Sequence, residues 1–452
     1  MRSLVSEQAA RRAALRIARH LATVVDIPLS LRLWDGTLVP LGQGASDDRW
    51  ISLRGPAAIG SLLRRPTLDT LFRLYVSGDI DLHGTDLLAC FDLARDRRKQ
   101  KHLFSRLRKG FPWTAVPPLL LARERHRELC HEFLGDESGR RLSRRDDTRF
   151  VRFHYDASNA FYALFLDDEM VYSCAYFTDW ANALDQAQID KLDLICRKLR
   201  LKKDETFLDI GSGWGALVCH AAKHYGVRAH GVTLSQAQYD YAREKIARSG
   251  LADRVSVELR DYTNLEGTYD KIASIGMYEH VGIANYPAYF RQIRRLLNDG
   301  GIFLNHGITR RAKRDPRDFA RISAGKRVIL KYIFPGSELD HIGHTIQEME
   351  TCGFEIHDVE GLRLHYARTC KLWYRRLLER QDEAVRLVGA ERFRMWAAYL
   401  AGVSGAFEQG PLRVYQTVAT KLAPTGGSPL PPTRADVYRT LLSRDAVAAR
   451  TS

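Results

Sequence analysis

The sequence predicts an α/β protein: a main domain with a mostly parallel sheet covered by helices on both faces, and a smaller α+β domain before it. From about residue 150, short apolar runs alternate with stretches whose apolar residues recur at helical spacing, and a glycine-rich turn follows the first run. Strands that alternate with helices in this way form a parallel sheet. At 452 residues the chain is also too long for one ordinary domain.

The expected elements of the main domain follow in a regular order. A helix with a buried face comes first, because Ile189, Leu192, Ile195, Cys196 and Leu199 recur at helical spacing. Strands are expected at Phe207–Ile210, Arg228–Val232, Val255–Leu259, Lys271–Ile275 and Ile302–Asn305. Helices are expected between them at Ala216–Tyr225, Gln236–Arg248 and Tyr286–Leu297, and Gly300-Gly301 should form a turn before the last strand.

The region before the main domain has mixed patterns. We expect a helix at Ala9–Val25, strands at Leu29–Leu33 and Trp50–Leu53, a hairpin turn at Asp35-Gly36, and helical segments from Ala57 to Leu93. The predicted divisions are an α+β domain over 1–94, a basic helical connector over 95–149, the main domain over 150–422, and a Pro/Gly-rich linker and tail over 423–452.

The formal net charge is +15, and it is unevenly distributed. Residues 95–149 contain 16 Lys and Arg against 8 Asp and Glu. Such a basic surface attracts nucleic acid or anionic lipid headgroups, and charge alone does not separate these two partners. A merely solvated surface is the further alternative. A second basic cluster, over 310–327, follows the last expected strand, where it could meet a lipid phosphate at the rim of the site.

Neither a membrane span nor a signal peptide is expected. No run approaches the roughly 18 apolar residues that a span requires, and arginines interrupt the first apolar stretches of the chain. We therefore expect a cytoplasmic protein, with the basic region holding it peripherally at the inner face of the membrane. The seven cysteines are scattered without a C-x-x-C pair, so neither a disulfide framework nor a metal site is expected.

The strongest local signal is the segment Asp209–Gly215, which stands between a strand and a helix. Its glycines are evenly spaced, unlike the dinucleotide G-x-G-x-x-G, and no phosphate-loop lysine follows. The D-x-G-x-G-x-G pattern resembles the cofactor loop of S-adenosylmethionine-dependent methyltransferases. Most of these enzymes have an acidic residue after the second strand, whereas polar side chains, Thr233 and Gln238, stand near that place here.

Seven segments in order carry a more specific resemblance. They are His154–Asp156, Tyr172–Phe177, the glycine loop, Thr233–Ser235, Gly276–Gly282, Lys331–Gly336 and His365–Thr369. Together they resemble the cyclopropane fatty acid synthase and mycolic acid cyclopropane synthase family, from about Phe150 to Lys421. Val76–Asp81 is similar to the N-terminal domain of many bacterial lipid-modifying members. The resemblance implies a Rossmann-like class I methyltransferase fold.

The resemblance also implies a reaction. S-adenosylmethionine would donate a methyl group to the cis double bond of an unsaturated phospholipid acyl chain, and bound bicarbonate would remove a proton so that a cyclopropane ring closes. The implied bicarbonate cradle is Cys174, Glu279, His306, Tyr366 and the backbone of Ile308. The implied cofactor-binding residues are Tyr172, Ser173, Asp209, Gly211, Gly213, Thr233, Gln238, Asp261 and Tyr262. Taken singly, Cys174 is more typical of a small buried core residue than of a functional one, and His306 is as typical of a core histidine as of a functional one.

Several alternatives remain open. Tyr278 stands where the family often has phenylalanine, and its hydroxyl near a cation makes the product less certain; a methyl or methylene branch could replace the ring. A basic nucleic-acid methyltransferase explains the charge but lacks a nucleic-acid-reading motif, so we expect no nucleic-acid partner. A non-catalytic lipid-binding protein is a further alternative. The sequence does not decide the oligomeric state, with a homodimer among the options.

Overall fold

The computed structural model describes residues 6–93, 102–122, 129, 158–421, 426–428 and 430–438. The described residues form two compact units. The smaller unit draws on 1–132, 322–332 and 381–405, and the larger unit draws on 133–321, 333–380 and 406–452. These units combine separate stretches of chain, so the linear divisions at residues 94, 149 and 422 stay predictions. Most of the basic connector and the segment His154–Asp156 lie outside the described residues.

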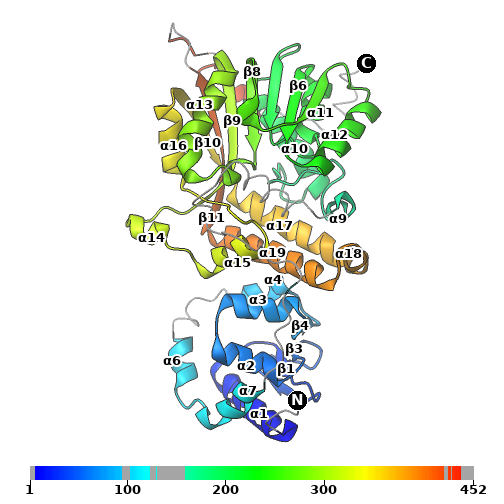
Figure 1. The fold of residues 1–452 in the computed structure, drawn as a ribbon, viewed down its shortest axis with the longest axis vertical. Coiled ribbons are helices and arrows are strands. Elements are labelled where there is room, and N and C mark those ends of the chain that lie inside the picture. The colour runs from blue at the N-terminus through cyan, green and yellow to red at the C-terminus, as the bar shows by residue number, and fades with distance from the viewer. Residues whose placement is uncertain are drawn as a thin grey trace. The chain divides into compact units, whose positions relative to one another are not determined.

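The smaller unit contains a four-stranded sheet in the order β2-β1-β3-β4. Its strands are β1 (Ser30–Arg32), β2 (Leu38–Pro40), β3 (Trp50–Leu53) and β4 (Ile80–His83). Its helices include α1 (Glu7–Val24), α2 (Pro56–Arg64), α3 (Leu68–Val76), α4 (Leu87–Leu93), α6 (Leu103–Arg108), η1 (Trp113–Ala115), α7 (Val116–Leu121), α15 (Ala324–Tyr332) and α18 (Gln381–Val388), with most of α19 (Ala390–Gln409). The predicted α+β character is confirmed (Figure 1).

Two expectations for this unit have different outcomes. The hairpin is confirmed, because β1 pairs antiparallel with β2 and Gly36 has φ +88°. The expectation of only helical segments from Ala57 to Leu93 is wrong at β4, which pairs with β3. Gly78 stands just after α3 with φ +77°, a conformation that glycine adopts without strain and that lets the chain leave the helix.

The larger unit is built on a seven-stranded sheet in the order β10-β11-β9-β8-β5-β6-β7. Its strands are β5 (Thr206–Ile210), β6 (Arg228–Thr233), β7 (Val255–Leu259), β8 (Tyr269–Ile275), β9 (Leu297–Arg310), β10 (Phe354–Gly361) and β11 (Leu412–Lys421). β11 is antiparallel to both of its neighbours, and the other four pairings are parallel. The mostly parallel sheet is therefore confirmed.

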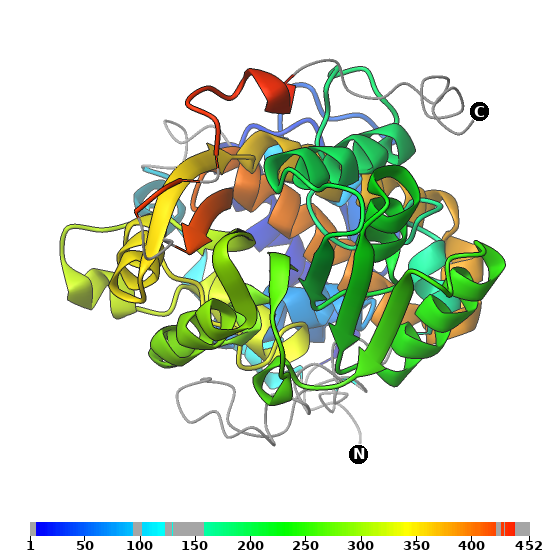
Figure 2. The same ribbon diagram turned by 90° about the horizontal axis from the view of Figure 1, so that it is seen from above.

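Helices cover both faces of this sheet, as predicted (Figure 2). The helices of the larger unit are α9 (Asn159–Ala163), α10 (Leu184–Lys198), α11 (Ala216–Tyr225), α12 (Gln236–Arg248), α13 (Tyr286–Leu296), α14 (Pro316–Ala320), α16 (Ile342–Thr351), α17 (Arg363–Glu379) and the short α20 (Ala435–Tyr438). The 3₁₀ turns η2 (Tyr262–Asn264), η3 (Tyr278–His280) and η4 (Ile283–Asn285) follow β7 and β8. The bounds of α11, α12 and β7 match the expected ranges.

Two features of the sheet differ from expectation. The Gly300-Gly301 pair does not form a separate turn but lies inside β9, where the pairing with β8 jumps from Tyr269↔Leu297 to Lys271↔Ile302. Gly300 takes φ +71° at this irregularity, so the glycine pair bends the strand without ending it. The strands β10 and β11 were not expected, and β11 contributes a residue to the site.

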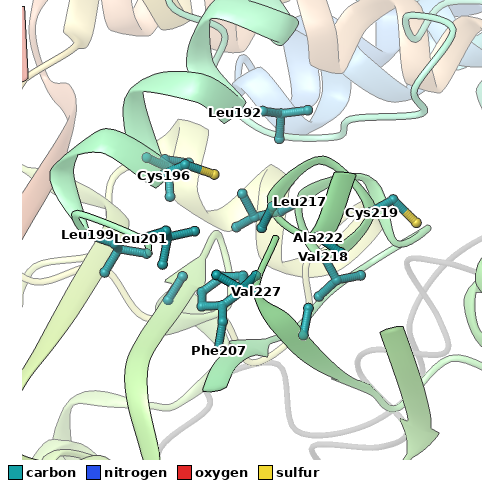
Figure 3. Close-up of a cluster of buried hydrophobic side chains, with 14 of the residues drawn as sticks. Leu192, Cys196, Leu199, Leu201, Phe207, Leu217, Val218, Cys219, Ala222 and Val227 are labelled. Atoms are coloured by element: carbon teal, nitrogen blue, oxygen red, sulfur yellow. The ribbon is translucent and has the colours of Figure 1, made fainter. Parts of the chain in front are cut away.

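Alternate residues of the central strands enter two apolar cores. On one face, Phe207 packs with residues of α10 and α11 (Figure 3). Leu304 and Val418 belong to the same core. On the other face, Leu208, Phe303 and Ala419 pack with α13 and α16. Successive strand residues point to opposite faces, so this alternation fixes the register of the sheet. The sheet is thereby held rigidly, and its carboxyl edge can carry a site.

Where the structure describes the end of the chain, that segment is tied to the larger unit. Asp436 forms an ion pair with Arg200, Arg434 forms one with Asp358, and Val437 is buried. Within the described ranges, no helix combines the length and apolar character that crossing a bilayer requires.

Candidate active site

The glycine loop leaves β5 and enters α11 with three left-handed residues. Gly211, Gly213 and Gly215 have φ of +82°, +55° and +83°. A Cβ at Gly215 would lie 3.1 Å from the Cβ of Ala242, so this glycine lets α11 and α12 approach. Around Gly213, by contrast, no described atom lies within 4 Å of where a Cβ would stand. The backbone at Gly213 therefore borders open space, as close approach of a cofactor requires.

Polar residues lie at the carboxyl ends of β6, which is next to β5, and of β7, which is next to β6. The Thr233 hydroxyl donates to Oε1 of Gln238 at 2.9 Å, which turns the Gln238 amide NH₂ group to the opposite side. Both residues are buried. The backbone N–H of Arg260, after β7, donates to the Thr233 carbonyl at 3.1 Å, which brings the Asp261-Tyr262 corner beside this pair. Asp261 Oδ1 accepts from the Thr263 N–H at 2.8 Å, which shapes that corner.

The segment Tyr172–Phe177 is held between two helices. From α10, Gln188 Nε2 donates to the Ser173 carbonyl at 3.0 Å, and Lys191 Nζ donates to the Ser173 hydroxyl at 2.9 Å. From α17, the Thr369 hydroxyl accepts the Ala175 N–H at 3.1 Å. This double anchoring fixes Tyr172, Ser173 and Cys174 although the segment has no regular secondary structure.

Lys191 is a buried cation that sequence reasoning missed. It is 2 % exposed, and burial lowers its pKa to about 8 although nearby acids, Asp167 and Asp209 among them, raise it. Burial raises the pKa of Asp209 to about 7, while the Lys191 charge opposes that rise. The same ammonium acts on the pKa of Cys174 and of His306, so these residues share one electrostatic environment. The sequence offered one indication that Lys191 is buried, because it stands beside the apolar positions of the expected helix.

The Cys174 thiol is fully buried and donates to the carbonyls of Ala175, at 3.3 Å, and Leu362, at 3.8 Å. Burial raises its pKa well above the ordinary value. The thiol therefore stays protonated, and a neutral thiol does not compete as a nucleophile for an electrophilic methyl group.

Glu279 follows β8, and His306 lies on β9 opposite Ile275, the last residue of β8. Glu279 Oε1 accepts the backbone N–H of Ile308 at 2.6 Å, so the structure brings Glu279 and Ile308 into direct contact. Burial raises the pKa of Glu279 to about 7 and lowers that of His306 to about 3. Two buried atoms, Glu279 Oε2 and His306 Nε2, have no hydrogen-bond partner among the described residues.

Gln416 is the second residue that sequence reasoning missed. It lies on β11 directly across from His306 on β9, and its Nε2 is 3.2 Å from His306 Nδ1. The amide is fully buried. A glutamine that alternates with Val414 and Val418 was a possible signal of a buried polar group, but that strand was not expected.

Tyr366 joins the site through aromatic contacts. Its ring stacks on Phe407 at 4.6 Å and meets the edge of Trp373 at 6.1 Å, and Trp373 also contacts the ring of Tyr172 at 5.1 Å. The backbone N–H of Leu362, just before α17, bonds to β11. The part of the Tyr366 hydroxyl in an anion cradle stays a prediction.

The Tyr278 hydroxyl does not face a reacting group. It bonds to the Thr345 hydroxyl at 2.7 Å, and the Tyr278 ring stacks on Tyr286 at 4.4 Å within the core under α13. The structure thus assigns Tyr278 to packing.

Comparisons with known proteins agree with this arrangement. The family model for mycolic acid cyclopropane synthetase matches residues 142–417. A probable fatty acid methyltransferase of Pseudomonas putida is 38% identical over 91% of this chain and 97% of its own length. The structure of the cyclopropane synthase MmaA2 from Mycobacterium tuberculosis is 32% identical, with a TM-score of 0.58 over 61% of this chain and 98% of that one. Mycolic acid cyclopropane synthase CmaA1, complexed with SAH and CTAB, is 34% identical, with the same TM-score and coverage.

Proposed function

Because the chain belongs to the mycolic acid cyclopropane synthetase family and is an S-adenosylmethionine-dependent methyltransferase, we propose that it is a cyclopropane-fatty-acyl-phospholipid synthase. It would convert the cis double bond of an unsaturated phospholipid acyl chain into a cyclopropane ring. When bound, S-adenosylmethionine supplies an electrophilic methyl group and bicarbonate supplies a proton acceptor. The methyl carbon forms a bond to each alkene carbon and loses one proton, which balances the reaction with S-adenosylhomocysteine as the second product.

The observation that carries the proposal is the pair of buried unpartnered atoms, Glu279 Oε2 and His306 Nε2. Buried polar atoms are almost always hydrogen-bonded, so two of them on residues of the neighbouring β8 and β9 segments indicate a polar ligand. Bicarbonate fits both, because its hydroxyl can donate to a carboxylate and its charged oxygens can accept from an imidazole N–H. The residues present therefore suit the small anion that the sequence led us to expect.

The cofactor would be held by the residues at the strand ends. The open space beside Gly213 would admit the cofactor, and the Ser173 hydroxyl is held by Lys191. The Gln238 amide would donate a hydrogen bond to the cofactor through its NH₂ group. A cationic sulfonium also favours the nearby carboxyl group of Asp209 in its charged form. These assignments, with Tyr172, Gly211, Thr233 and the Asp261-Tyr262 corner, are part of the proposal.

The same site would protect a cation formed on the acyl chain. The rings of Tyr172, Tyr366 and Trp373 touch one another in sequence and offer electron-rich faces. Such faces stabilise a cation by about 0.5–2 kcal/mol each. The protonated Cys174 thiol and the absence of a described strong nucleophile among these residues favour ring closure over trapping of the cation.

A second product is favoured by one finding: the relative from Pseudomonas putida is named a probable fatty acid methyltransferase. A methyl or methylene branch would keep the cofactor, the substrate and the base but change the fate of the cation. One experiment distinguishes cyclopropanation from branching. The protein is incubated with S-adenosylmethionine, bicarbonate and dioleoyl phospholipid vesicles, and the extracted lipid is examined by proton NMR. Upfield ring protons support cyclopropanation. Vinylidene or new methyl signals without ring protons would replace it with branching.

Access to lipid would involve the exposed basic segment 311–321. Arg311, Lys313, Arg314, Arg317 and Arg321 are exposed there, accompanied by Asp315 and Asp318. Each basic residue near an anionic membrane contributes about 1 kcal/mol to the free energy of binding. Peripheral membrane association predicts co-sedimentation with phosphatidylglycerol vesicles that weakens with salt, and Arg311→Ser/Arg314→Ser/Arg317→Ser should weaken it further. Binding equal to that of phosphatidylcholine vesicles would argue against this surface. The cytoplasmic location and a homodimer stay predictions.

A further inference from the structure

Gln416 and His306 form a buried cross-strand pair. They occupy directly opposite positions on β11 and β9, with Gln416 0 % and His306 1 % exposed. The amide nitrogen of Gln416 lies 3.2 Å from Nδ1 of the imidazole. The other ring nitrogen, Nε2, has no hydrogen-bond partner among the described residues.

This contact has a consequence for the imidazole proton. Burial lowers the pKa of His306 to about 3, so the ring is neutral near pH 7 and carries one proton. An amide NH₂ group can only donate, so Nδ1 must accept. The single proton then resides on Nε2, and the hydrogen bond at one ring nitrogen sets the state of the other.

We propose that Gln416 is a positioning residue that holds His306 in its Nε2–H tautomer and so presents an N–H donor to the bound anion. The inference rests on the proposed function, in which bicarbonate lies between His306 and Glu279. The donor on one side and the carboxylate on the other orient the anion: its charged oxygen faces Nε2–H and its hydroxyl faces Glu279. With the other tautomer, Nε2 would be an acceptor and would repel that oxygen.

Packing alone does not account for Gln416. Its neighbours on the same face of β11, Val414 and Val418, are apolar, and the Gln416 Oε1 atom has no described partner. Burying an amide is costly unless its hydrogen bonds are made. An apolar side chain would fill this position at lower cost, so the bond to Nδ1 is the contribution that an apolar residue could not make.

The direct test is ¹⁵N NMR of the full chain with ¹⁵N-labelled histidine, without cofactor or lipid. The His306 signals are assigned by their loss in His306→Asn. We expect the Nε2–H tautomer in the unmodified protein. In Gln416→Met, which keeps the side-chain length but cannot donate, both tautomers should appear. In Gln416→Glu, the proton should move to Nδ1. An Nδ1–H tautomer in the unmodified protein, or an unchanged tautomer in Gln416→Met, would overturn the proposal.

Kinetics in the vesicle assay give a second readout. Gln416→Met should raise the KM for bicarbonate about tenfold and leave the Kd for S-adenosylmethionine unchanged. Thr420→Val is the matched control: Thr420 is on the same strand and its hydroxyl bonds to another histidine, His357, at 2.7 Å. This control should leave both constants unchanged. If Gln416→Met and Thr420→Val lowered kcat equally and left the KM for bicarbonate unchanged, Gln416 would have only a structural role.

Failure of this inference and failure of the proposed function are distinguishable. The NMR measurement needs no substrate, so it can reject the tautomer while the vesicle assay still yields cyclopropane lipid. Conversely, an unmodified protein that makes no lipid product rejects the function whatever the tautomer of His306.

Discussion

Replacing Glu279 by glutamine should remove a pH-dependent contribution to folding stability. Burial, at 6 % exposure, raises the pKa of this carboxyl from 4.5 to about 7, because the charged form is poorly solvated. The folded protein therefore binds more protons than the unfolded chain between these two pKa values. The stability that results is fully present below pH 4.5 and is lost as the pH rises through about 7.

The size of this effect follows from the two pKa values. One pKa unit corresponds to about 1.4 kcal/mol, so a rise from 4.5 to about 7 corresponds to about 3 kcal/mol. Relative to Glu279→Gln, the unmodified protein should lose about this much free energy of unfolding between about pH 4.5 and about pH 8. Glutamine retains the shape and can still accept the Ile308 N–H, so the comparison isolates the charge.

Urea unfolding of both proteins, followed by fluorescence at several pH values, measures the difference. Other buried acids such as Asp209 titrate in both proteins and cancel in the difference. A difference in the free energy of unfolding that stays constant across this pH range would refute the reasoning, because it would mean that the Glu279 carboxyl has the same pKa in the folded and the unfolded protein. Glu279→Gln should also abolish lipid turnover at every pH if the carboxylate orients the anion.

Three further predictions concern single contacts. Lys191→Met, which removes the bond to Ser173, should weaken S-adenosylmethionine binding about tenfold by calorimetry, and an unchanged Kd would exclude that role. Gly213→Ala should reduce the free energy of cofactor binding by more than it reduces the free energy of unfolding. The control is Gly250→Ala, because Gly250 also has a positive φ and borders open space; it should lower the free energy of unfolding by about 1 kcal/mol and leave cofactor binding unchanged. Tyr278→Phe should lower the free energy of unfolding by about 1 kcal/mol through loss of a buried hydrogen bond, and unaltered urea midpoints would contradict its burial.

The alternating part of the larger unit could be predicted because local patterns and tertiary structure agree there. Runs such as Phe207–Ile210 end in glycines, and the helices that follow carry apolar residues at regular spacing, so the expected bounds from β5 to α13 agree with the structure within two residues. The strand expected at Ile302–Asn305 is longer in the structure, where β9 extends five residues further at each end. β10 was missed for a physical reason: it lies at the edge of the sheet, and half-exposed or charged residues such as Glu355, His357 and Glu360 interrupt its apolar pattern. The strand at this edge of the sheet could therefore be identified only from the structure.

At the candidate site, the sequence could predict some residues but not the contacts between them. Resemblance could name Glu279, which stands in a segment typical of the family, and His306, which residue-by-residue matching to the family implied. It could not show that His306 faces Gln416, since strand register across β9 and β11 depends on a pairing of residues more than a hundred positions apart. Lys191 was hidden in the opposite way, because a lysine on a helix normally points to solvent. Both residues act on the proton and charge of a neighbour, so sequence can identify the reacting groups of this site, whereas their protonation states follow only from the fold.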